Sequence, residues 1–271
     1  MMECCENVRK AAARGHLDCL QRIHKNGKEW DRDVIYHAII NGRLDCLRYA
    51  HENGCPWGSF MAMVAAKGGH LDCIKYAHEN GCPWNSVITC AATVGNHLNC
   101  LQYAHENGCP WDPSTTYAAA TKGRLDCLKY AHENGCPWDP KTTYVAAING
   151  RLECLKYAHE NGCPWDSETI YNAAQRGSLD YLRYAHENGC PWHPSTTQAA
   201  ADISRLDCLK YAHENGAPTT DTDTQQMIIA LYKQDISRLF SDNTTYFGII
   251  PEDIRDSIAE FYAGSMLHSP K

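Results

Sequence analysis

The chain has 271 residues, of which 44% are hydrophobic and 21% are charged, and its formal net charge is −7 at pH 7. This length can bury an extended core, and the sequence holds no run of about 18 apolar residues that would predict a membrane-spanning helix. The negative net charge opposes binding to a phosphate backbone, and the polar positions carry mixed charges, so we expect neither nucleic acid nor a membrane as a partner.

The N-terminal residues MMECCENVRKAAARGHLDCL lack the apolar stretch of a signal peptide. They begin a pattern that recurs every 27 residues, because Ala11 and Gly15 are in register with later copies. Six of the eight copies contain the string NGCPW, and its glycine position runs from Gly27 to Gly216. A fixed period of this length is typical of a repeat protein, in which each unit contacts its neighbours. We therefore expect eight repeats over residues 2–217.

One complete copy, residues 112–138, predicts two short helices. The first helix opens with Asp112 as a candidate N-cap. Its central alanine, Ala119 in this copy, does not vary along the chain and predicts a close approach of two helix backbones. The second helix has apolar residues at helical spacing, such as Leu125 and Leu128, and ends at Asn134-Gly135, where the glycine can close a helix in the left-handed conformation. Each unit is therefore helix, turn, helix and loop.

The string AAxxGxLxxLxxxxxxG resembles the core of the ankyrin repeat, with the same spacing between its two glycines. The resemblance covers residues 2 to about 217 and implies an all-α, helix-turn-helix solenoid. An ankyrin repeat usually has about 33 residues, and the residues missing here fall where the family forms a β-hairpin. The hairpins are therefore expected to be shortened or absent. The resemblance also implies a protein–protein interaction scaffold.

The unit departs from the ankyrin pattern at two places. Thr-Thr-Tyr-x, as at residues 115–118, stands where the family has Thr-Pro-Leu-His, and CPWD replaces the hairpin strand. The 27-residue form with CPW is similar to arrays that are encoded by giant DNA viruses of protists. Oomycetes and algae also encode such arrays. That likeness implies a viral or protist source and, for a viral protein, the host cytoplasm.

Thirteen of the sixteen cysteines recur with the repeat. One set lies in the second helix, like Cys127, and another lies in the NGCPW loop, like Cys136. Equivalent residues of neighbouring repeats lie about 8–10 Å apart, which exceeds the ~7 Å between Cα atoms that a disulfide allows. We therefore expect buried thiols in a reducing, cytoplasmic compartment, with no metal and no cofactor. A zinc site built from His132, Cys136 and their equivalents is the alternative.

A histidine recurs from His24 to His213, at a position that is usually leucine in ankyrin repeats. We expect each imidazole to pack against the next unit and to hydrogen-bond a loop carbonyl, with a pH-sensitive stack as the alternative. The seven tryptophans are expected to connect repeats rather than to form a ligand cage. No Gly-rich phosphate loop, HExxH or GxSxG motif occurs, so we expect no catalytic residues and no enzymatic activity.

The strict repeat is lost over residues 218–271. Residues 222–231 continue a helical period, and Ile236 with Leu239 predict the second helix of a degenerate ninth repeat, followed by a C-terminal capping helix. The stretch IPEDIRDSIAEF also resembles the first helix of F-box-like tails that follow ankyrin arrays in poxviruses. That resemblance implies, as an alternative function, a substrate-recognition adaptor that recruits ubiquitin-ligase machinery.

Positions that vary between copies are free for partner recognition, whereas invariant positions build the array. The variable positions fall on the first helix of each unit, which we expect to form the concave surface. The predicted partner-contacting residues are Phe60, Val64, Lys67, Lys122, Lys141, Ile148, Asn149, Glu168, Asn172, Gln175 and Arg176. We expect a monomer that binds a protein whose identity the sequence does not give.

Overall fold

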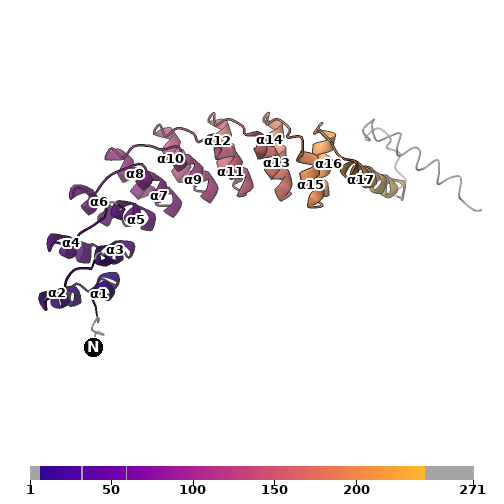
Figure 1. Ribbon diagram of the computed structural model, residues 1–271. Helices are drawn as coiled ribbons and strands as arrows, with labels where there is room; N and C mark the ends of the chain where they lie inside the picture. The colour runs from indigo at the N-terminus through magenta and orange to yellow at the C-terminus, as the bar shows by residue number, and fades with distance from the viewer. Residues whose placement is uncertain (1–6, 32, 59, 242–271) are drawn as a thin grey trace, which may run out of the picture. The chain divides into compact units, whose positions relative to one another are not determined.

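The computed structural model describes residues 7–31, 33–58 and 60–241. All regular secondary structure in these ranges is helical, and successive helices form pairs along the chain (Figure 1). The structure confirms the predicted all-α class, and the described residues contain no strand that could form a hairpin. No described helix is both long enough and apolar enough to cross a bilayer. We call the odd-numbered helices α1 to α15 first helices and the even-numbered helices α2 to α16 second helices.

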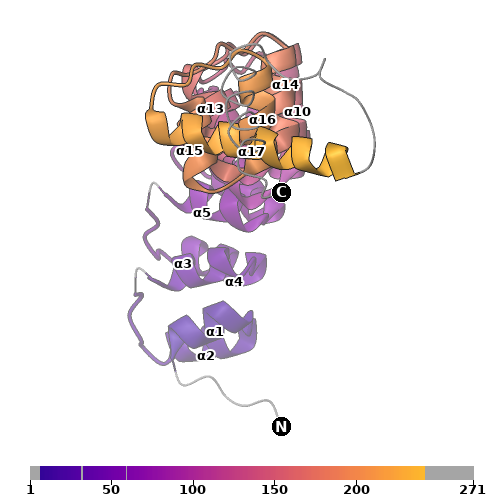
Figure 2. The same ribbon diagram turned by 90° about the vertical axis from the view of Figure 1, so that its right-hand side faces the viewer.

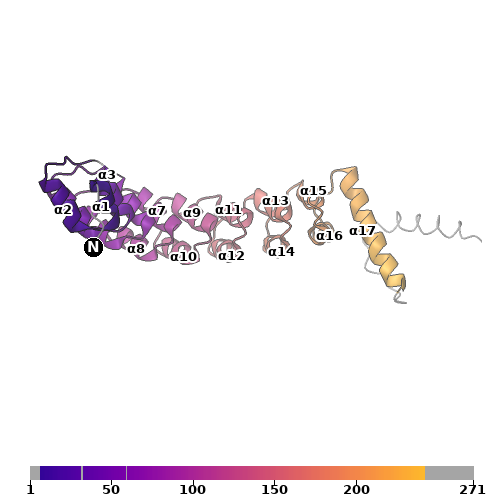
Figure 3. The same cartoon turned by 90° about the horizontal axis from the view of Figure 1, so that it is seen from below.

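The chain divides into two compact units, of which unit 1 comprises residues 1–142 and 153–163. Its first helices lie on one side and its second helices on the other, as α7, α9, α8 and α10 show in Figure 3. The pairs α1/α2 and α3/α4 are stacked in the same way (Figure 2). The helices of unit 1 are α1 Val8–Arg14, α2 Leu17–Lys25, α3 Asp33–Ile40, α4 Leu44–Glu52, α5 Met61–Gly68, α6 Leu71–Glu79, α7 Val87–Gly95, α8 Leu98–Glu106, α9 Ser114–Lys122, α10 Leu125–Glu133 and most of α12 Leu152–Glu160.

Unit 2 comprises residues 143–152 and 164–271. Its pairs α13/α14 and α15/α16 are built like those of unit 1, and a single longer helix follows them. The helices of unit 2 are most of α11 Thr142–Ile148, α13 Ser167–Arg176, α14 Leu179–Glu187, α15 Thr196–Asp202, α16 Leu206–Glu214 and α17 Thr222–Ser241.

The invariant apolar positions form the core of each unit. In unit 1, Ala38, Ala65 and Ala92 have no exposed surface, which fits the predicted packing of neighbouring first helices. The second helices bury leucines such as Leu101 and Leu128 completely. Each such leucine contributes about 1.5–3 kcal/mol on burial. The short helices are therefore held by their neighbours, since an isolated helix of this length is unstable in water.

A Schellman motif ends the second helices, as Gly135 illustrates. Gly135 has a φ of 83° and donates to the carbonyl of His132, while the N–H of Cys136 donates to the carbonyl of Ala131 at 2.9 Å. These bonds satisfy carbonyls that the last helical turn leaves open. The predicted role of glycine at this position is confirmed. The following loop then turns into the next repeat without a hairpin.

A polar residue one to three positions before the helix caps most of the first helices. Asp112 Oδ1 accepts from the N–H of Ser114 at 2.8 Å, which confirms the predicted N-cap. Hydrogen bonds from Ser114 hold the pKa of Asp112 below its usual range. Equivalent bonds come from Asp31, Asn85, Asp139, Asp166 and His193. Gly58 stands at this position before α5, so no side chain from this position caps that helix.

The C-terminal prediction needs one correction. The expected second helix at Ile236 and Leu239 is wrong, because α17 runs without a break from Thr222 to Ser241. Within unit 2, α17 lies against α15 and α16. Its Tyr232 is 4% exposed, lies 6.0 Å from the His213 ring between ring centroids, and donates to Glu214. The predicted capping helix and the F-box-like stretch lie outside the described residues.

Candidate functional site

The recurring histidine, tryptophan and tyrosine of neighbouring repeats pack as a group of three rings. The His132 imidazole stacks on Trp138 with ring centroids 4.6 Å apart, and its Nδ1 lies 3.1 Å from the hydroxyl of Tyr157. Packing against the next repeat is thus confirmed. The expected loop-carbonyl partner is wrong, because the tyrosine of the adjacent second helix occupies the space beside Nδ1. The same contact joins His24 to Tyr49, His51 to Tyr76, His78 to Tyr103 and His186 to Tyr211.

The tryptophan of this group also bonds to the next repeat through its backbone. Trp138 Nε1 donates to the carbonyl of Asn161 at 3.0 Å, and the Asn161 amide donates to the carbonyl of Tyr157. Trp30, Trp111, Trp165 and Trp192 donate to Asn53, Asn134, Asn188 and Asn215 in the same way. The interpretation of these tryptophans as connectors between repeats is confirmed.

The cysteines of the NGCPW loop are buried hydrogen-bond donors. Cys136 is 3% exposed, and its Sγ lies 3.5 Å from the carbonyl oxygen of Asp112 in the preceding loop. Burial raises the pKa of Cys136 to about 12. None of the cysteines in the described residues forms a disulfide, and no group of three metal-ligating side chains occurs there. Their burial places these thiols in the packing between repeats.

An arginine or histidine follows the turn between the two helices of many repeats. Arg43 Nε donates to the carbonyl of Ala13 at 3.3 Å, and His70 Nε2 lies 3.1 Å from the carbonyl of Ile40. Each side chain therefore reaches the end of the preceding first helix, where a cation or N–H donor is favourable. Sequence analysis missed this row, although the 27-residue spacing of these arginines and histidines was its signal. Its role is structural.

In unit 1 the predicted partner-contacting residues lie on first helices or at their ends. Phe60, which precedes α5, is 47% exposed. Lys67 and Lys122 are exposed at the ends of α5 and α9, and Lys141 is exposed just before α11. Val64 is half-buried on α5.

In unit 2 the predicted residues are divided between exposed and half-buried positions. Glu168, Gln175 and Arg176 of α13 are exposed, whereas Ile148 and Asn149 at the end of α11 are half-buried. Arg176 Nη1 donates to the carbonyl of Ile148, so this arginine also connects two first helices within the unit.

The prediction that Asn172 contacts a partner is wrong, because its side chain is buried. It is 4% exposed, and its amide donates to the carbonyl of Glu168 at 2.6 Å. The equivalent residues Ala91, Ala118 and Val145 are buried as well, because this helical position faces neighbouring packed residues. Asn172 therefore cannot contact a partner on the outer surface.

Unit 1 exposes four apolar side chains on or beside its first helices. They are Ile40 at 44%, Phe60 at 47%, Val87 at 48% and Tyr117 at 36% exposure. Exposed large apolar side chains are candidates for partner contacts, because a partner that covers them removes apolar surface from water. Sequence analysis named only Phe60 of the four, although Phe60 and Val87 are one repeat apart. We call these four residues the apolar face of unit 1.

A pocket of about 580 Å³ lies beside Phe60 within unit 1. It is open to solvent and lined by Asp33, Tyr36, Pro56, Trp57, Gly58, Phe60 and Met61. The Tyr36 and Phe60 rings stand with centroids 6.4 Å apart at an angle of 58°, and Met61 is buried. Three aromatic residues in the lining, Tyr36, Trp57 and Phe60, make this a candidate site for part of a ligand.

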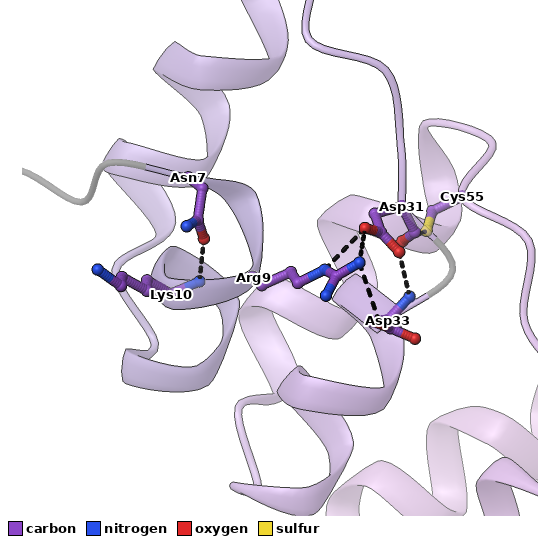
Figure 4. Close-up of polar contacts among 6 residues, drawn as sticks. All are labelled: Asn7, Arg9, Lys10, Asp31, Asp33 and Cys55. Carbon is purple, nitrogen blue, oxygen red and sulfur yellow. Dashed lines mark hydrogen bonds and ion pairs between the residues drawn. The ribbon is translucent and has the colours of Figure 1, made fainter.

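Asp33, which lines this pocket, shares one arginine with Asp31 (Figure 4). Arg9 Nε donates to Asp31 Oδ2 at 2.7 Å, and Arg9 Nη2 lies 3.1 Å from Asp33 Oδ2. The backbone N–H of Asp33 and then the Arg9 guanidinium hold the pKa of Asp31 below its usual range. Half of the Asp33 side-chain surface remains exposed.

Residues 8–86 match the family model described as ankyrin repeats, in three copies. These residues are ankyrin repeats. The chain is also similar to a solved structure described as the human ASB11 ankyrin repeat domain, with a TM-score of 0.57 and 17% identity over 70% of this chain and 100% of that one. At this identity the likeness shows the ankyrin fold alone. No curated protein matches the chain.

Ankyrin repeats generally mediate protein–protein interaction and use extended surfaces for it. The ankyrin repeats at residues 8–86 contain α3 and α5, the helices beside the pocket. The pocket and part of the apolar face therefore lie within the segment that the family model identifies.

Proposed function

We propose that this chain is a protein-interaction scaffold whose partner docks on the first helices. The observation that carries the proposal is the apolar face of unit 1, where Phe60 and Val87 expose nearly half of their surface. Invariant residues elsewhere in the repeat are already used by packing, so the variable first-helix positions are available for recognition. The predicted contact residues other than Asn172 belong to this proposal.

The buried thiols support the further proposal that the protein works in a reducing compartment. Buried cysteines without disulfides suit a reducing environment such as the cytoplasm. The adaptor alternative depends on residues outside the described ranges and stays a prediction from the sequence.

Site-specific photocrosslinking tests the docking surface. A benzophenone amino acid would replace Phe60 or Lys122 on the first helices of unit 1, or the exposed Asp126 or Lys129 of α10 as matched controls. In extracts of the source cell we expect one common adduct from the first-helix positions. A partner captured only through Asp126 or Lys129 would place the binding surface on the second helices instead.

A further inference from the structure

We propose that the pocket beside Phe60 binds a cationic side chain of the partner, an alkylammonium or guanidinium group. The inference rests on the proposed function, because it names the chemistry by which this surface recognises a protein. The pocket lies wholly within unit 1, between α3, α5 and the loop that joins their repeats.

The walls of the pocket suit a cation with an apolar stem. Tyr36, Trp57 and Phe60 supply three aromatic rings, and a cation over an aromatic face is attracted by the negative charge density of the ring. His51 stacks on one face of Trp57 at 3.9 Å between centroids, which fixes the orientation of that indole. Met61, 3% exposed, offers an apolar surface to the methylene groups of a lysine or arginine.

The charge beside the rings has the matching sign. Asp33 is a charged residue of the described pocket lining, and the N–H of Asp33 donates to the carboxylate of Asp31 beside it. Within the described residues, the two carboxylates contact the guanidinium of Arg9, and half of the Asp33 side-chain surface stays exposed and can receive a second cation. Arg9 already shows that this edge attracts a cation. A neutral apolar side chain would contact the rings but would gain nothing from Asp33.

A local change in the repeat produces this site. The position of Gly58 holds Asp112, Asp139 or another capping residue in neighbouring repeats, and the position of Phe60 holds Val87 or Ser114. An ideal Cβ placed on Gly58 would lie 3.0 Å from Phe60 Cε1, so a side chain there would push the ring. The glycine therefore leaves room for the Phe60 ring beside Trp57.

The test uses small probes of defined charge on the full chain. We would label the protein with 5-fluorotryptophan, assign the Trp57 signal with Trp57→Phe, and titrate the acetylated amides of trimethyllysine, lysine and norleucine. We expect the trimethyllysine derivative to shift the Trp57 signal saturably. Norleucine, which has an apolar stem without charge, should bind at least about fivefold more weakly than the trimethyllysine derivative.

Two variants separate charge from apolar contact. Phe60→Leu keeps an apolar side chain but removes the ring, and Asp33→Asn removes the negative charge, so each should weaken trimethyllysine binding and leave norleucine binding nearly unchanged. Val87→Ala is the matched control, because it changes the equivalent position one repeat away. Circular dichroism would show that each variant is folded.

Equal binding of norleucine and trimethyllysine would overturn the inference and make the pocket a simple apolar anchor. The absence of any shift at Trp57 would also overturn it. Continued photocrosslinking of a partner from Phe60 or Lys122 in either case would leave the proposed scaffold function standing, so the two failures are distinguishable.

Discussion

At the scale of single residues, the string YAHENGCPW shows how one side chain can serve two neighbouring repeats. In residues 130–138, the Asn134 amide donates to the carbonyl of Tyr130, and the Asn134 carbonyl accepts from Trp111 of the preceding repeat. The next glycine closes the helix, and Cys136 donates back to Asp112. A substitution in this string therefore disturbs a contact between repeats as well as a local one.

The hydroxyl of Tyr157 provides a direct test of the three-ring group. Tyr157→Phe removes the bond to His132 but keeps the ring beside Trp138 and under the Lys129 ammonium. We expect the free energy of unfolding to fall by about 0.5–1.5 kcal/mol, measured by urea denaturation. Tyr117→Phe, at an exposed position of the same unit, is the control and should change little.

Gly58→Asp tests the link between capping and the pocket. The new carboxylate can cap α5 as Asp112 caps α9, so we expect a gain of about 1 kcal/mol in unfolding free energy. Its Cβ must also displace the Phe60 ring, so trimethyllysine binding should weaken. Calorimetry and the probe titration measure the two effects. A variant that is no more stable than the parent would contradict the capping part.

At the scale of helices, the turns decide which glycines can be replaced. Gly54 ends a second helix with a φ of 83° and has nothing within 4 Å of an added Cβ. Gly42, between α3 and α4, has a φ of 63° and would place a Cβ 2.5 Å from His70 Nδ1. A side chain at Gly54 would cause backbone strain alone. A side chain at Gly42 would also clash with His70 of the neighbouring repeat.

Gly42→Ala should therefore lower the stability of the protein more than Gly54→Ala does. We expect Gly54→Ala to cost about 1–2 kcal/mol from the left-handed conformation alone. Gly42→Ala should cost more, because the His70 imidazole must move and lose its contact with Ile40. Equal losses in thermal unfolding would show that His70 moves at no cost.

The helices also explain why the site could be predicted only in part. The repeat pattern identified the first helices and placed Phe60 and Lys67 among their variable positions. It could not show that Asn172 faces the interior, because the variation of a position does not report its burial. The pocket was not predicted, since its walls come from a helix, a loop and the next helix, and the tryptophan there was expected only to connect repeats.

At the scale of the whole molecule, each unit depends on covering the ends of its helical stack. In unit 2 this covering comes from α17, whose Tyr232 lies against His213 and under Lys210. The sequence spacing between His213 and Tyr232 is shorter than that of the other histidine–tyrosine pairs. One long helix therefore supplies a contact that a complete repeat supplies elsewhere.

Tyr232→Ala tests whether α17 stabilises unit 2. The side chain is 4% exposed, so its loss should cost about 3 kcal/mol and increase hydrogen exchange in α15 and α16. Tyr232→Phe, which keeps the ring and removes the hydroxyl that donates to Glu214, should cost about 1 kcal/mol. Unchanged exchange in α15 and α16 would mean that α17 does not act as a cap.

The buried thiols predict how stability varies with pH. Burial raises the pKa of Cys73, Cys136 and Cys190 to about 12, and the neutral thiol is the form that the folded state favours. Their contribution is complete below the unfolded pKa, which lies near 8.5, and is lost as pH rises toward the folded value. Urea denaturation should show a steady decrease in stability above about pH 9. A constant stability between pH 7 and pH 10.5 would contradict this account.

The sequence by itself determined the all-α class and the order of helices and turns within each repeat, because a fixed period ties each residue type to one local environment. Tertiary structure decided what needs two repeats at once: the tyrosine partner of each histidine, the burial of Asn172 and the pocket between Tyr36 and Phe60. It also decided the structure that follows the last repeat, since α17 continues as one helix where the sequence pattern predicted two. Contacts between repeats depend on the distance and orientation of packed helices, and a pattern along one chain does not record these.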